Sequence, residues 1–465
     1  MSPATTRRPK IKSCNGASSR YSGWPLRLIG AFVGAFVLSS AFAGCASANS
    51  GPSEIGPDGR LVPGANERFK SSLGVLLDDS LRIIAGKRVA IITNHTGIDE
   101  RRRRNVDLLT TDKRAVAAGV KLVRIFAPEH GIGGTEDRAN LPNARDEKTG
   151  LPIISLYQSS TVPPADSMFR DIDVLLVDLQ DIGTRTWTYV GVMLYAMHAA
   201  GKNDVPVVVL DRPNPITGDH TEGALLDTAL ANPNPPTADR PGNGFALWPI
   251  PLRHGLTMGE LARYFHAQMK LPVRLTIVPM RGWRRDMWFD ETPMPWVRPS
   301  PNMPTLESAL MYPALVPFER TNVSVGRGTD EPFQRFGAPW LRADSVARML
   351  DDLSLAGVRF KAERFTPSKP TDGKYDGQSI PGVRIEITDR DQAQPSRVGS
   401  AILWALNRMH ADSLRIQARG FDERLGSTQI REALLQGADP DAIIDRQLPA
   451  VVAFEREARR FHLYR

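Results

Sequence analysis

Short runs of branched apolar residues recur along the chain after residue 66 and predict a series of β-strands. The expected strands span residues 88–93, 122–127, 153–157, 174–179, 207–210 and 275–279. Most of these runs are apolar at successive positions, so both faces of each strand should be buried. Burial on both faces is typical of parallel strands that are covered by helices.

Amphipathic stretches lie between these runs and predict helices, among them residues 105–118, 188–200 and 257–269. The last has a clear start, because Thr257 can cap the helix and Glu260 follows at the spacing of a capping box. Strands that alternate with helices predict an α/β fold with a Rossmann-like, doubly wound and mainly parallel sheet.

The pattern changes near residue 300, where the segment 299–304 is too rich in proline for regular structure. The elements expected after it are helices at 345–353 and 401–409 and strands at 358–365 and 383–388. A length of 465 residues suits two domains. We therefore expect a Rossmann-like domain at 67–300 and a smaller C-terminal α+β domain at 301–465.

The first 44 residues have the features of a bacterial signal peptide, with six basic residues, no acidic residue and an apolar run at 28–42. Small residues then precede Cys45, a pattern that resembles a lipobox, so we expect Cys45 to carry lipid. The alternative is ordinary cleavage after 41–43, which would give a soluble secreted protein. Residues 45–66 predict a flexible tether. The protein is thus expected in the periplasm or cell envelope, anchored to a membrane by its lipid.

Charge and cysteine content exclude some classes of function. The formal net charge is +8, but removing the six basic residues of the signal peptide leaves only +2. A nearly neutral mature chain does not favour nucleic-acid binding, which needs clustered positive charge. Cys14 and Cys45 are the only cysteines, so the mature chain can form no internal disulfide.

Polar residues and turn formers follow four of the predicted strands at the point where each strand ends. The four segments are 93–97 (TNHTG), 128–134 (PEHGIGG), 178–185 (DLQDIGTR) and 211–215 (DRPNP). Ligands of open α/β sheets bind at the edge formed by the carboxyl ends of the strands. We therefore expect these segments to form one shared site.

The sequence lacks the motifs that are typical of several classes of enzyme. There is no P-loop and no G-x-G-x-x-G after the first strand, so no nucleotide cofactor is expected. There is also no H-E-x-x-H and no cysteine pair, so no metal is expected. Ser324 stands in no nucleophile elbow, since Asn322 replaces the first glycine of that motif. A metal-dependent hydrolase remains an alternative, with its ligands at His95, His130, Asp178 and Asp211.

Carboxylates are the reactive groups that these loops can offer. Hydrolysis of a glycosidic bond needs a carboxylic acid that protonates the leaving oxygen, and commonly a second carboxylate. Glu129 suits the first role, because Pro128 restricts its backbone and His130 is its neighbour. The alternative is a structural glutamate that caps a helix or pairs with an arginine.

A series of motif strings resembles the NamZ-type exo-β-N-acetylmuramidases. The strings are TNHTG (93–97), PEHG (128–131), LPIISLY (151–157), DLQDIG (178–183), TWTY (186–189), VLDRPNP (209–215), RHG (253–255), PSPNMP (299–304), ERTNVSVGRGT (319–329) and GAPW (337–340). The resemblance runs in collinear order from about residue 68 to residue 465. The resemblance implies a glycoside hydrolase that cleaves the β-1,4 link between N-acetylmuramic acid (MurNAc) and N-acetylglucosamine (GlcNAc). It would release MurNAc from the non-reducing ends of peptidoglycan fragments, in a cleft between the two domains.

The resemblance also implies roles for individual residues. Glu129 matches the glutamate regarded as catalytic in the family. Glu222 is the first choice for a second carboxylate, with Asp178, Asp181 and Glu319 left open. An arginine fork suits the lactyl carboxylate of MurNAc. The arginines in the motif loops are Arg185, Arg212 and Arg327, any of which could instead brace a loop through carbonyl contacts.

The remaining expected contacts are with sugar hydroxyls and the acetamido group. The candidates are Asn94, His95, His130, Asn214 and Asn302, whose alternative role is to stabilise turns. The expected substrate-binding set also contains Asp178, Asp181, Asp211 and Glu319. Trp187 and Tyr189 could stack on a sugar or belong to the core.

Some positions depart from the family pattern and bear on the substrate. Arg320 and Val325 replace more usual residues, and residues 232–251 form a long, proline-rich stretch. A non-catalytic lipoprotein that binds wall fragments would use the same fold and remains an alternative. Such a binder would tolerate Glu129→Gln, whereas an acid catalyst would not.

Overall fold

The computed structural model describes residues 54–55, 61–62, 68–136, 141–157, 162–231 and 244–465. The expected signal peptide and Cys45 lie outside the described residues. Of the expected tether, only β1 (Glu54–Ile55) and β2 (Leu61–Val62) are described, and they pair antiparallel. Within the described ranges, no helix has the length and apolar character needed to cross a membrane.

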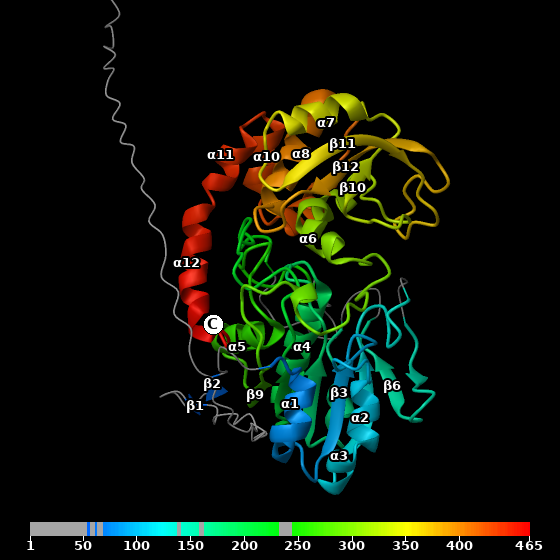
Figure 1. The fold of residues 1–465 in the computed structure, drawn as a ribbon, viewed down its shortest axis with the longest axis vertical. Helices are drawn as coiled ribbons and strands as arrows, with labels where there is room; N and C mark the ends of the chain where they lie inside the picture. Colours follow the sequence, from blue (N-terminus) through cyan, green and yellow to red (C-terminus); the bar gives the residue numbers. More distant parts are fainter. Residues whose placement is uncertain (1–53, 56–60, 63–67, 137–140, 158–161, 232–243) are drawn as a thin grey trace, which may run out of the picture. The chain divides into compact units, whose positions relative to one another are not determined.

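A seven-stranded sheet forms the first part of the fold (Figure 1). Its strands are β3 (Arg88–Thr93), β4 (Lys121–Ala127), β5 (Ala144–Arg145), β6 (Pro152–Ser155), β7 (Val174–Asp178), β8 (Val207–Leu210) and β9 (Leu275–Val278). They lie in the order β5-β6-β4-β3-β7-β8-β9, and every pair is parallel except β5 with β6. Numbered along the chain, the parallel strands follow the Rossmann order 3-2-1-4-5-6. The order reverses between β3 and β7, and the carboxyl ends of these strands therefore mark the expected ligand crevice.

Helices cover both faces of this sheet, as the doubly wound prediction requires. They are α1 (Ser72–Asp79), α2 (Asn105–Thr111), α3 (Lys113–Ala117), α4 (Thr188–Lys202) and α5 (Met258–Gln268). Successive side chains of a strand point to opposite faces of the sheet and belong to different apolar cores. Val89 and Ile91 of β3 pack with α1, α2 and α3, whereas Ala90 and Ile92 pack with α4 and α5. This alternation is the two-residue period of a β-strand.

The predicted helix at 105–118 is in fact two helices. Asp112 has an extended backbone between α2 and α3, and its side chain accepts a hydrogen bond from the backbone N–H of Arg114. Aspartate favours this N-cap position over a helix interior, so a new helix starts there. The capping box at the start of α5 is confirmed, with Thr257 and Glu260 bonding each other's backbone.

A smaller domain with an antiparallel sheet follows. Its strands are β10 (Arg335–Gly337), β11 (Val358–Phe365) and β12 (Ile380–Ile387), in the order β10-β12-β11. Its helices are α6 (Leu306–Leu315), α7 (Ala343–Asp351), α8 (Pro395–His410), α9 (Ala418–Leu425), α10 (Thr428–Leu435), α11 (Pro440–Asp445) and α12 (Leu448–Ala458). Short 3-10 helices occur at Leu81–Ile83, Asp166–Phe169, Phe289–Glu291, Val316–Arg320 and Arg459–Phe461.

The C-terminal residues return to the large sheet. Phe461 and His462 follow α12, which is drawn in red in Figure 1. Their carbonyls accept hydrogen bonds from the Arg263 guanidinium on α5. The backbone N–H of Leu463 donates to Glu260 at 2.9 Å. The last residues of the chain are therefore fixed against the first part of the fold.

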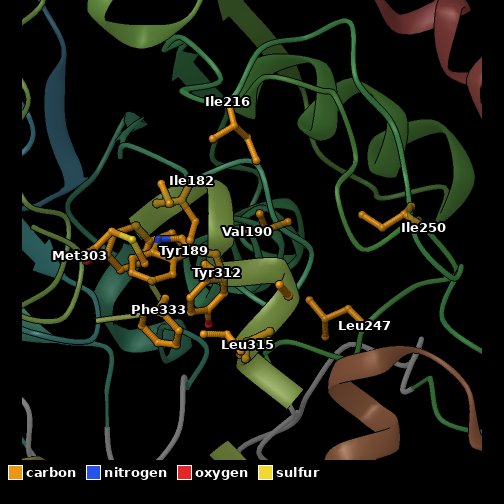
Figure 2. Packing of buried hydrophobic residues seen from close by; sticks show 14 of the residues in the cluster. Ile182, Tyr189, Val190, Ile216, Leu247, Ile250, Met303, Tyr312, Leu315 and Phe333 are labelled. Carbon is orange, nitrogen blue, oxygen red and sulfur yellow. The ribbon is translucent and has the colours of Figure 1, made fainter. Parts of the chain in front are cut away.

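One apolar core joins the two sheets. Figure 2 shows part of it, where Tyr189 of α4 and Tyr312 of α6 lie among other buried side chains. Trp187 packs edge-on against both rings, with centroids 5.4 Å from Tyr189 and 5.8 Å from Tyr312. Tyr312 in turn meets Phe333 at 4.7 Å. Because Trp187 and Tyr189 are buried, they belong to the core, which was one of the two roles predicted for them.

Candidate active site

Glu129 lies two residues after the end of β4, at the carboxyl edge of the sheet. Its carboxylate Oε2 accepts a hydrogen bond of 2.7 Å from the Thr188 hydroxyl at the first residue of α4. Its neighbour His130 has φ +70°, an uncommon backbone conformation for a residue with a side chain. The side chain of Glu129 is partly exposed, so a ligand can reach it.

Asn94 and His95 follow β3 and hold the proline-rich segment that begins at residue 299. Asn94 Nδ2 donates to the Tyr189 hydroxyl at 2.9 Å, and that hydroxyl donates to the Pro299 carbonyl at 2.8 Å. His95 Nε2 lies 2.5 Å from the carbonyl oxygen of Arg298. Burial is the main cause that lowers the pKa of His95, so the ring is neutral and Nε2 donates this bond. Both side chains therefore fix the position of the chain at residues 298–299.

Gly134 lies in the segment that follows β4, at a position with no room for a side chain. It has φ +67°, and a Cβ there would overlap the His95 ring. We expect Gly134→Ala to lower the free energy of unfolding by about 1–3 kcal/mol, the cost of a strained backbone. Gly133→Ala is the matched control, because its Cβ would lie 3.8 Å from the nearest atom. Urea unfolding of both variants tests this, and similar losses would contradict it.

Asp178 and Arg212 are bonded to each other rather than to open space. Arg212 Nε donates to Asp178 Oδ1 at 2.6 Å, and the two side chains are 5% and 0% exposed. Asn105 donates to the other carboxylate oxygen at 2.6 Å. Arg212 also donates to the carbonyl of Ile98. These contacts fit the loop-bracing alternative for Arg212.

Asp211 is buried at the end of β8, and its hydrogen bonds connect β8 to the start of α5 and to the C-terminal segment. Its carboxylate accepts hydrogen bonds from the backbone of Arg212 and Gly259 and from the hydroxyls of Thr257 and Tyr464. Burial raises the pKa of Asp211 to about 7, although the bond from Tyr464 opposes this shift. Its contacts are those of a structural residue.

The raised pKa of Asp211 predicts a pH dependence of stability. Between its usual value of 3.8 and about 7, the folded protein holds a proton that the unfolded chain has lost. The free energy of unfolding should therefore fall as pH rises through this window. Asp211→Asn cannot titrate, so its unfolding free energy should fall less over the same range. Urea titrations at several pH values measure both slopes, and equal slopes would contradict the prediction.

Asp181 and Asn214 stabilise the loops that follow β7 and β8. Asp181 accepts from the backbone N–H of Gly183 at 2.7 Å and lies 3.3 Å from His254 Nε2. Asn214 Oδ1 accepts from the backbone N–H of Ile216, and its Nδ2 donates to the Leu256 carbonyl. This is the turn-stabilising role that was the alternative for asparagine. Asn302 is buried in the proline-rich segment.

Glu222 and Arg185 both connect the first part of the fold to the smaller domain. Glu222 accepts from Arg253 Nη1 at 3.0 Å and from the backbone N–H of Ser396, near the start of α8, at 3.1 Å. Burial raises the pKa of Glu222. Arg185 donates to the carbonyls of Phe245, Glu423 and Arg424, the last two on α9. Burial lowers the pKa of Arg185 to about 9. These contacts fit the bracing alternative for Arg185.

Glu319 and Arg327 form a partly buried ion pair in the smaller domain. Arg327 Nε donates to Glu319 Oε1 at 3.0 Å, and Arg424 Nε lies 3.5 Å from the other oxygen. Burial favours the neutral acid, but the two arginines outweigh it and lower the pKa of Glu319. Arg327 also lies over the ring of Phe333, which links this pair to the Tyr312 cluster.

The structure therefore groups only some of the expected site residues. His130 is next to Glu129 in the chain, and Asn94 bonds Tyr189, the neighbour of the Thr188 that bonds Glu129. His95 bonds the Arg298 carbonyl. The other candidates, apart from Asn302, have the separate partners described above. Thr188 was not among the expected site residues, although it lies in the TWTY motif. In the described part of the chain, no three His, Cys, Asp or Glu side chains are grouped to hold a metal ion. The metal-hydrolase alternative has no such group to support it there.

Comparisons with known proteins cover nearly the whole described chain. The family models for the N-terminal and C-terminal parts of exo-β-N-acetylmuramidase NamZ match residues 89–307 and 310–464. The peptidoglycan β-N-acetylmuramidase NamZ of Bacillus subtilis (strain 168) is 36% identical over 410 residues, which cover 88% of this chain and 94% of that protein.

The fold of this chain is also similar to those of solved structures. Two DUF1343 family proteins from Bacteroides fragilis NCTC 9343 match with TM-scores of 0.75 and 0.65, at 33% and 26% identity. Each match covers 86% of this chain and 99% of the other. Because both family models match and the identity extends over most of the chain, the chain belongs to the NamZ family of exo-β-N-acetylmuramidases.

Proposed function

We propose that this protein is a glycoside hydrolase that cleaves the β-1,4 link between MurNAc and GlcNAc and releases MurNAc from the non-reducing ends of peptidoglycan fragments. The observation that carries the proposal is the 36% identity with the Bacillus subtilis muramidase over 88% of this chain. The placement of Glu129 at the carboxyl edge of the sheet, where ligands bind in such folds, supports it.

In the proposed mechanism Glu129 is the general acid. Its carboxyl proton passes to the glycosidic oxygen as the bond from that oxygen to the anomeric carbon breaks, and GlcNAc leaves as an alcohol. Water then adds its hydroxyl group to the anomeric carbon of MurNAc, and its remaining proton restores the acid form of Glu129. Glu222 was expected as the second carboxylate, but its bonds to Arg253 and Ser396 support a bracing role between the domains.

Hydrolysis of the nitrophenyl β-glycosides of MurNAc and GlcNAc, and of the disaccharide MurNAc–GlcNAc, tests the proposed function. We expect release from the MurNAc glycoside and cleavage of the disaccharide, with no release from the GlcNAc glycoside. If the protein binds MurNAc but cleaves none of the three, the non-catalytic binding alternative replaces the proposal.

We further propose that residues 1–44 are a signal peptide, that lipid on Cys45 anchors the protein in the cell envelope, and that residues 45–66 are its tether. The apolar run and small residues before Cys45 support this. We also propose domains at 67–300 and 301–465, which the two family matches at 89–307 and 310–464 support. Membrane fractionation of the wild type and Cys45→Ala tests the anchor, because only the variant should appear in the soluble fraction.

A further inference from the structure

We propose that Thr188 is a positioning residue for Glu129, whose hydroxyl holds the carboxyl group so that Oε1 is the oxygen that delivers the proton. The inference rests on the proposed muramidase function and on the bond of 2.7 Å from Thr188 Oγ1 to Glu129 Oε2.

The backbone around Glu129 has little freedom. The ring of Pro128 restricts the chain before it, and His130 after it has φ +70°. The His130 ring is itself fixed, because its Nδ1 lies 2.7 Å from the carbonyl oxygen of Glu136. The rotation of the Glu129 side chain is therefore the main freedom left, and Thr188 is the partner that restrains it.

Thr188 is itself held in place by its neighbours along the chain. It is the first residue of α4, which runs over Thr188–Lys202. Tyr189 is buried and bonded at its hydroxyl to Asn94 and to the Pro299 carbonyl. Trp187 is packed between two aromatic rings. Threonine is also β-branched, so its side chain has few rotamers.

The chemistry of the two groups decides which oxygen carries the proton. A hydroxyl has a single proton to donate, and here it is directed at Oε2. With the hydroxyl donating to Oε2, the acidic proton of Glu129 resides on Oε1, because the carbonyl oxygen of a carboxyl group accepts a hydrogen bond better than its hydroxyl oxygen. When that proton leaves, Oε2 becomes part of a carboxylate, and the bond from Thr188 strengthens because the acceptor is charged.

A bond that strengthens as the proton leaves acts on the reaction step more than on substrate binding. We expect Thr188→Val, which has nearly the same shape but no hydroxyl, to lower kcat on MurNAc–GlcNAc by about 10- to 100-fold with KM little changed. Thr188→Ser keeps the hydroxyl and should restore most of kcat. Thermal unfolding of both variants establishes that they are folded.

A further measurement separates positioning from a general structural role. The loss in Thr188→Val should be smaller on the nitrophenyl glycoside, because nitrophenolate leaves without needing a proton.

The outcomes distinguish this inference from the proposed function. If the wild type cleaves neither substrate, the proposed function fails. If the wild type is active and Thr188→Val has wild-type kcat on the disaccharide, the positioning role is overturned while the function stands. Equal losses on both substrates without rescue by Thr188→Ser would also overturn it.

Discussion

Glu129→Gln is expected to lower the turnover of MurNAc–GlcNAc by about 10²- to 10⁴-fold, the usual contribution of a general acid. Glutamine has nearly the shape of the acid, and its carbonyl oxygen can still accept the hydrogen bond from Thr188, so the fold and sugar binding should persist. What it lacks is an acidic proton for the leaving oxygen. Steady-state release of GlcNAc measures the effect, and MurNAc binding by calorimetry checks that the site is intact.

Two variants serve as controls for this experiment. Glu147→Gln makes the same chemical change at an exposed position and should leave turnover unchanged. Glu222→Gln removes a charge from the pair with Arg253, so it should lower stability more than it lowers turnover. Full activity of Glu129→Gln would exclude an acid role for Glu129. If Glu222→Gln lowers turnover more than it lowers stability, Glu222 takes part in the reaction.

Asp178→Asn is expected to lower the free energy of unfolding by about 3–5 kcal/mol, because it leaves the Arg212 charge buried and without its counterion. The native pair is fully enclosed at Asp178, and Asn105 completes the hydrogen bonding of the carboxylate. An asparagine of the same size cannot supply the negative charge. Urea unfolding of the wild type and the variant measures the difference.

Asp173→Asn gives the matched comparison at an exposed ion pair. Asp173 accepts from Arg88 at 2.8 Å, and both side chains are exposed, so water screens the pair and the loss should be much smaller. Replacing both Asp178 and Arg212 by apolar residues should recover part of the lost stability. Equal losses in Asp178→Asn and Asp173→Asn would show that the buried ion pair contributes no more to the free energy of unfolding than the exposed one.

Local pattern was sufficient to predict much of the secondary structure. The strands at 88–93, 207–210 and 358–365 were predicted with their observed bounds, because their apolar residues are contiguous or alternate in a clear period. The helix α6 was not predicted, because Pro313 lies inside a helix that is buried over most of its length and shows no amphipathic period. The break at Asp112 was missed because an aspartate can also lie on an exposed helix face.

The partners of the candidate site residues could not be predicted in the same way. The sequence placed Asp178, Asp211 and Arg212 correctly at strand ends, but whether they face substrate or each other depends on strand order. Arg212 reaches Asp178 because β7 and β8 are neighbours in the sheet. Tyr464 reaches Asp211 because the C-terminus returns to the large sheet.

The sequence by itself determined the alternating strands and helices, the location of polar segments at the strand ends, and Glu129 as the leading catalytic candidate. The first two depend on residue type and on spacing within one element, which are local properties. The choice of Glu129 depends on the collinear motifs that resemble the NamZ family. Only the tertiary structure decided that Thr188, 59 positions along the chain, bonds Glu129, and that Asp178, Asp211 and Glu222 are paired within the protein. A hydrogen bond or an ion pair depends on distance in space, and only the packing of the sheet and the smaller domain sets that distance.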